Sequence, residues 1–146
     1  MAEVIKFGSW SLDTVPGGWE PLPEGLRRAG QNVFPSNVVL MEEPLPAGMT
    51  LQRYVENQIQ VMQHVLPDPK VKGPESVALF ASDQCQTLRV SYQSSDGQPV
   101  VQAQIYTTSG QHVGIVTFTT VQPQQAEVEK DFKSIAKGLR FAASDK

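Results

Sequence analysis

The sequence predicts an α+β fold in which an antiparallel β-sheet is flanked by two main helices. Strand-like segments come before and after one clear amphipathic helix, and a second helix closes the chain. Short hairpin-type turns separate the later strands, so neighbouring strands run antiparallel, and this order is typical of a sheet with helices packed against it. The 146 residues, 40% of them hydrophobic, suit a single domain spanning residues 1–146.

The N-terminal segments are short and broken. Residues 4–12 alternate loosely between apolar and polar side chains, which predicts one or two short strands with a break at Gly8. Residues 16–35 are rich in proline and glycine, so we expect an ordered but irregular excursion, with Trp19 packed on the core. Residues 37–43 are then predicted to form a strand that a proline-rich turn ends.

The segment after that turn gives the clearest prediction, an amphipathic helix. Thr50 is a favourable N-cap, and Pro67 stops the helix. Between them, apolar residues recur three and four positions apart: Leu51, Tyr54, Val55, Ile59, Met62 and Leu66. The helix is therefore expected to pack this stripe against the sheet.

Three strands are predicted in the second half, at residues 87–93, 100–107 and 113–121, with a fainter one at 76–80. A final helix is predicted to open at Pro123, with acidic residues in its early turns, where they suit the helix dipole. The residues expected to face inward from it are Val128, Phe132, Ile135, Ala136 and Leu139.

The composition argues against several functional classes. A formal net charge of −3 at pH 7 gives no excess of cations for a phosphate backbone, so nucleic acid is not an expected partner. His64 and His112 stand at no ligand spacing from each other or from Cys85, which predicts no metal site, and no cofactor motif is present. No catalytic constellation emerges either, so we expect a protein that is not an enzyme.

The N-terminus and the cysteine usage predict a location. Residues 1–7 contain an early acidic residue and no continuous apolar region, unlike a secretory signal. No stretch approaches the roughly 20 apolar residues of a membrane-spanning helix. A single cysteine, Cys85, suits a reducing compartment. We therefore expect a cytoplasmic protein that is not itself inserted in a membrane.

Polar side chains occupy positions where an apolar residue is expected. Gln58 falls within the helix stripe, and an inward-facing amide needs a partner, because leaving it unpaired costs about 1 to 3 kcal/mol. That partner could belong to the fold or to a bound molecule. In the strand at 100–107, Gln102, Gln104 and Tyr106 share one face. The two strand glutamines are either simply exposed to solvent or part of a binding surface.

A succession of short motifs resembles the DcrB-related domain. The motifs are Gly18-Trp19, Asn37-Val38-Val39-Leu40, Glu43-Pro44-Leu45-Pro46-Ala47-Gly48-Met49-Thr50-Leu51, Tyr54-Val55-x-x-Gln58, Val101-Gln102-Ala103-Gln104-Ile105-Tyr106 and Thr117-Phe118-Thr119-Thr120. Their order and spacing carry the resemblance, which covers nearly the whole chain. It implies a fold similar to the PsbP and Mog proteins, an antiparallel sheet flanked by helices.

Members of this family without a signal peptide look like the Eag chaperones of type VI secretion. The resemblance implies a homodimer that holds the hydrophobic N-terminal transmembrane helices of a secreted effector, of the PAAR or Rhs type, before loading on the secretion spike. It also implies that one helix glutamine and one strand glutamine, Gln58 and Gln104, reach polar groups on the client. The predicted client-helix-binding residues are Gln58, Gln104, Asn37, Val39, Met41 and Gln102.

Two alternatives belong to other functional classes. The chain could be a DcrB-like structural or adaptor module without a helix client, or a small hydrolase with Cys85 as its nucleophile. An adjacent gene encoding a PAAR domain and apolar N-terminal helices would favour the chaperone over the adaptor. Full retention of function in Cys85→Ser would exclude the hydrolase.

Overall fold

The computed structural model describes residues 5–28, 36–79, 82–122 and 125–142 and has the predicted α+β fold. Its elements in chain order are β1 (Ile5–Phe7), β2 (Trp10–Leu12), β3 (Trp19–Leu22), β4 (Gly25–Arg28), β5 (Asn37–Pro44), α1 (Leu51–Val65), β6 (Lys70–Leu79), β7 (Ser82–Gln93), β8 (Pro99–Ser109), β9 (His112–Val121), α2 (Gln125–Gly138) and β10 (Leu139–Phe141).

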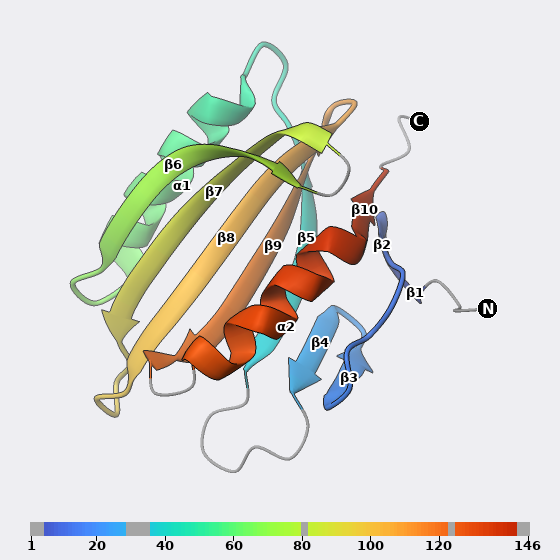
Figure 1. Cartoon of the computed structure of the whole chain (residues 1–146). Helices are drawn as coiled ribbons and strands as arrows, with labels where there is room; N and C mark the ends of the chain where they lie inside the picture. Colours follow the sequence, from blue (N-terminus) through green and yellow to red (C-terminus); the bar gives the residue numbers. More distant parts are fainter. Residues whose placement is uncertain (1–4, 29–35, 80–81, 123–124, 143–146) are drawn as a thin grey trace.

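The strands form two antiparallel sheets. The large sheet has seven strands in the order β3-β4-β5-β9-β8-β7-β6, and the small one has the order β1-β2-β10. Figure 1 shows α2 and the small sheet in front of the large sheet, and α1 behind it on the opposite face. Each face of the large sheet is therefore covered by a different helix.

Each face also has its own hydrophobic core. The core on the α2 side includes Leu40, Phe118 and Ile135, together with residues of the small sheet. The core on the α1 side joins Tyr54 and Val55 of the helix to apolar residues of β7, β8 and β9. The alternation of side chains along each strand divides them between the two cores.

The small sheet pairs strands from near the two ends of the described chain, and it packs against the large sheet. Trp10 of β2 is 1% exposed, stacks on Phe141 of β10 with ring centroids 4.8 Å apart, and donates its indole N–H to the Met41 carbonyl at 2.9 Å. Gly114 of β9 makes room for this pair, because a Cβ there would lie 2.7 Å from the Trp10 ring. A larger residue at that position would force the two sheets apart.

The predicted helix with the Thr50 cap is confirmed. The Thr50 hydroxyl accepts a hydrogen bond from the Arg53 amide at 3.1 Å, and the helix ends at Val65, just before Pro67. The two short N-terminal strands with a break at Gly8 are confirmed as well, and Trp19 is packed on the core as expected.

The prediction of an irregular excursion was wrong for the described part of residues 16–35, where β3 and β4 form a hairpin. Pro21 is compatible with β3 because this strand lies at the edge of the sheet, where a missing N–H costs little. Gly25 lets β4 pair with β5, since a Cβ on it would lie 1.8 Å from the Val38 carbonyl oxygen. The same residues that suggested irregularity make this hairpin possible. Residues 29–35 lie outside the described part.

Other element boundaries also moved. The faint strand predicted at 76–80 is the edge strand β6, which starts earlier and contains Pro74 next to a register shift. Its neighbour β7 likewise begins before residue 87. Leu139, expected on the last helix, belongs instead to β10, a strand that the pattern did not reveal because it is short and pairs with a segment far away in sequence. Pro123, the predicted start of α2, lies outside the described residues.

Candidate functional site

The α1 side of strands β5, β9 and β8 carries a mixed polar and apolar surface. Partners across antiparallel strands point to the same face, so the pairing register places side chains in rows. One row runs Asn37, Thr119, Gln102, and the next runs Val39, Thr117, Gln104. Met41 begins a third row. We call this surface the amide face and define it by Asn37, Val39, Met41, Gln102, Gln104, Thr117 and Thr119.

The amide face is only partly covered. Within the described residues, none of its side chains belongs to either hydrophobic core. Helix α1 makes its contacts with β6, β7 and β8, and of these three strands β8 alone belongs to the amide face. Met41 is 49% exposed. The surface therefore combines amides, threonines and accessible apolar groups.

A hydrogen-bonded ladder along β8 fixes its two glutamines. The Tyr106 hydroxyl donates to Gln104 Oε1, and Gln104 Nε2 donates to Gln102 Oε1 at 3.2 Å. Tyr106 is itself 2% exposed, so the ladder is anchored in the α1-side core. The side-chain nitrogen of Gln102, at the end of the ladder, has no acceptor among the described residues and is available to an external group.

Asn37 provides the opposite kind of group, a free acceptor. Its Oδ1 atom is buried and has no donor within the described part of the chain. Asn37 shares a row with Gln102, so an acceptor and a donor that the fold leaves unused lie on the same strip of sheet. An unsatisfied buried acceptor costs about 1 to 3 kcal/mol of folding stability.

Two tyrosines join α1 to the amide face. The rings of Tyr54 and Tyr106 meet edge to face with centroids 6.1 Å apart. Burial first, and then the nearby carboxylate of Glu43, raises the pKa of the Tyr54 hydroxyl well above its ordinary value. The pKa of Tyr106 is raised by burial and by the charge of Glu43. No described group meets hydrogen-bond geometry at the Tyr54 hydroxyl itself, so Glu43 acts there through proximity.

Gln58 lies one turn after Tyr54 on α1 and is partly buried. Its amide makes no hydrogen bond to the described residues, so the structure does not join it to Gln104. Gln58 therefore lies partly buried on the helix, as expected from the stripe. Within the described residues, its amide has no hydrogen-bond partner. The five predicted sheet residues, Asn37, Val39, Met41, Gln102 and Gln104, do come together on the amide face.

Two exposed valines on α1 were not predicted as part of the site. Val61 is 52% and Val65 is 72% exposed. At 100° per residue, they fall with Tyr54 and Gln58 inside an arc of about 60°, and the Tyr54 contact with Tyr106 turns this flank of the helix toward β8. Their spacing of four residues, next to the main stripe, was the signal available in the sequence.

The described part of the chain offers few residues for catalysis or metal binding. No group of three or more His, Cys, Asp or Glu side chains there could hold a metal ion. Cys85 is 1% exposed inside the α2-side core, where a substrate could reach its thiol only if the core opened. His64 is exposed on α1. No described helix has the length and apolar character that crossing a membrane requires.

Comparison with known proteins places the chain in a family. The family model described as DcrB matches residues 26–138. No curated protein sequence matches the chain significantly.

Solved structures with the same fold are distant in sequence. LpqN of Mycobacterium tuberculosis, described as involved in cell envelope biogenesis, aligns with a TM-score of 0.68 at 16% identity over 98% of this chain and 91% of its own. A Pseudomonas aeruginosa protein of unknown function, PA94, gives 0.70 at 14% identity over 99% of both chains. The cyanobacterial PsbP protein of Synechocystis gives 0.61 at 13% identity over 97% and 94%. These similarities show a PsbP-like fold.

Proposed function

The chain belongs to the DcrB family, and we propose that it is a non-enzymatic cytoplasmic chaperone that binds the N-terminal transmembrane helices of a type VI secretion effector. In this proposal, it shields helices of the PAAR or Rhs type of effector until they are loaded on the secretion spike. The amide face is the binding surface.

The observation that carries the proposal is the pairing of unused polar groups with exposed apolar ones. A transmembrane helix outside a membrane aggregates unless its apolar surface is covered, and Met41, Val61 and Val65 offer apolar area for this purpose. Such helices also carry small polar residues, which need partners in an apolar setting. Gln102 supplies a side-chain donor that no described residue pairs, and the buried Asn37 oxygen supplies an acceptor that a client reaches only when the side chains around it move aside.

The arrangement favours one client helix lying between α1 and β5. Its polar side would face the ladder of Gln104 and Gln102, and its flanks would contact the exposed flank of α1 on one side and Val39 and Met41 on the other. Adaptable methionine suits a surface that must accept different sequences. Homodimer formation belongs to the proposal too, and would give two such surfaces for two client helices.

The test is co-expression with the N-terminal region of an effector encoded beside this chain, followed by affinity purification through one tag. Gln102→Ala and Gln58→Ala should each weaken the complex about twofold to tenfold, because a net hydrogen bond contributes about 0.5 to 1.5 kcal/mol. Gln52→Ala, an exposed position elsewhere on α1, is the matched control and should change nothing. If no soluble complex forms with any such client, the chaperone proposal fails and the adaptor alternative takes its place.

A further inference from the structure

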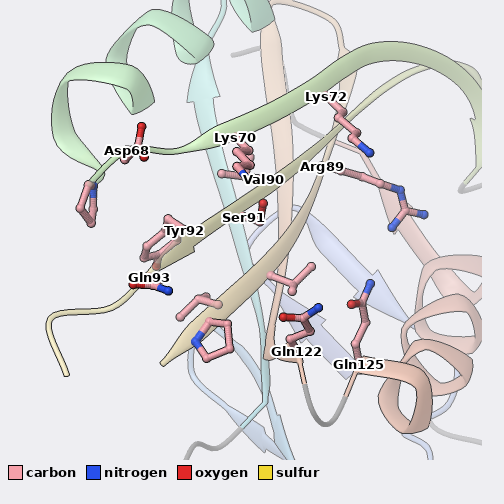
Figure 2. A pocket seen from close by; sticks show the side chains of 14 residues that line it. Asp68, Lys70, Lys72, Arg89, Val90, Ser91, Tyr92, Gln93, Gln122 and Gln125 are labelled. Atoms are coloured by element: carbon pink, nitrogen blue, oxygen red, sulfur yellow. The ribbon is translucent and has the colours of Figure 1, made fainter. Parts of the chain in front are cut away.

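A second surface lies on the opposite, α2 side of the large sheet. Strands β6, β7 and β8 and the start of α2 enclose an open concavity of about 760 Å³. Figure 2 shows Lys72 and Arg89 extending from neighbouring strands, with Gln122 and Gln125 pointing toward the same space from below. We call it the basic concavity, defined by Lys70, Lys72, Arg89, Ser91, Gln122 and Gln125.

The positions of the cations in this concavity are unfavourable for the stability of the sheet. Lys72 and Arg89 are direct partners across β6 and β7, and Lys70 lies opposite Ser91 on the same face. Like charges directly opposite each other on a sheet are destabilising. The chain as a whole carries a net charge of −3, so a local excess of cations does not follow from its composition.

Acids lie close to these cations, including Glu75, which is opposite Thr87 on the face that Arg89 shares, but within the described residues only Arg89 of these cations makes an ion pair. Arg89 reaches Glu129 at 3.7 Å, and the same carboxylate oxygen accepts a hydrogen bond from Gln125 at 3.1 Å. Asp68 also lines the concavity, but Figure 2 shows it at the opposite end from Lys72 and Arg89. Within the described residues, neither Lys70 nor Lys72 makes an ion pair.

We propose that the basic concavity binds an extended acidic segment of a partner protein. Lys70 and Lys72 stand two residues apart on one strand face, a spacing of about 6.6 to 6.8 Å, which matches carboxylates at alternate positions of an extended chain. Ser91 and Gln122 can hydrogen-bond the backbone or side chains of that segment.

An extended segment fits better than other anions. Arg89 is 59% exposed, and exposed ion pairs are individually weak, so binding needs several contacts in a row rather than one. Nucleic acid would require more cations than these three. The amide face is on the other side of the sheet, so the acidic segment and a helix client could be bound together.

The experiment uses fluorescence anisotropy with the full chain and a labelled peptide of alternating glutamate and serine. A peptide of the same composition with its glutamates clustered, and one with glutamine in place of glutamate, are the matched probes. The alternating peptide should bind tightest, and its affinity should fall as salt rises. Lys70→Gln combined with Lys72→Gln should weaken binding about threefold to tenfold. Lys6→Gln, an exposed site on β1 of the small sheet, should have no effect.

The folded state is not expected to suffer in this double variant, because neither lysine makes an ion pair within the described residues; a thermal melt verifies it. Equal binding of the double variant, or equal binding of the clustered peptide, would overturn the proposal. Displacement of the peptide by millimolar inorganic phosphate would reassign the concavity to small anions. A change of oligomeric mass in the double variant, seen by light scattering, would reassign it to a contact between copies of this chain.

Discussion

The two faces of the large sheet differ in how completely the fold uses them. On the α2 side, over β5 and β9, side chains such as Leu40 and Phe118 are buried under the helix and the small sheet. On the α1 side of the same strands, the fold leaves Met41 half exposed and an Asn37 oxygen without a partner. The same two strands thus contribute a closed core with one face, and with the other they leave an exposed apolar side chain and a buried acceptor without a partner.

The largest expected effect is a loss of folding stability from a substitution on the α2 side of the sheet. Trp10→Ala should lower the free energy of unfolding by about 3 to 5 kcal/mol, because it empties a fully buried ring site and removes the bond to the Met41 carbonyl. Urea unfolding followed by circular dichroism measures it. Met41→Ala, on the open face of the strand that Trp10 contacts, is the control and should cost less than about 1 kcal/mol. Similar losses in the two variants would show that the faces do not differ as described.

An effect of intermediate size is the pH dependence of folding stability that Tyr54 of α1 and Tyr106 of β8 cause. Tyr54 and Tyr106 have a raised pKa in the folded state, so both stay protonated at a pH where an unfolded tyrosine ionises. Their contribution to stability is complete below pH about 10 and is lost as the pH rises further. Each affected tyrosine lowers the free energy of unfolding by about 1.4 kcal/mol per pH unit above that point.

Urea unfolding between pH 8 and 11.5 measures this decline. The combined Tyr54→Phe and Tyr106→Phe variant should show a shallower loss than the natural chain, because it lacks the two hydroxyls whose pKa is raised in the folded state. An identical slope in the variant would mean that these hydroxyls are not shielded by burial and by Glu43.

The smallest expected effect is a gain in folding stability that is accompanied by weaker client binding. Asn37→Val should raise the free energy of unfolding by about 1 kcal/mol, since it removes an unpaired buried acceptor and suits a strand. The same change should weaken client binding. Denaturant unfolding and co-purification read the two effects separately, and a loss of stability above about 1 kcal/mol would show that Asn37 has a structural partner.

The sequence was most informative where a periodic pattern coincides with a strong local signal. The stripe and the Thr50 cap located α1, and strict alternation in β8 separated Gln102 and Gln104 from Ala103 and Ile105. Patterns failed where long-range pairing decides the outcome. The hairpin of β3 and β4 depends on the close approach of Gly25 to β5, and β10 exists only because β2 is beside it.

The candidate site divides in the same way. The family resemblance led to Gln104, strand alternation led to Gln102 and the shared face of residues 37–43 led to Asn37, and the register of the sheet shows all three on one face. The four-residue spacing of Val61 and Val65 puts them beside the helix stripe, but their exposure depends on how far α1 covers the sheet. The basic concavity was also missed, since its cations come from two strands whose register only the fold defines.

The client helix is expected to lie on the amide face and not on the α2 side of the large sheet. Site-specific photocrosslinking tests it most directly, with p-benzoylphenylalanine placed at Met41, at Val61 or at the exposed Ser134 of α2 during co-expression with an effector N-terminal region. We expect strong crosslinks to the client from positions 41 and 61 and none from position 134. Crosslinks from position 134 with none from the other two would put the client on the α2 side of the sheet instead.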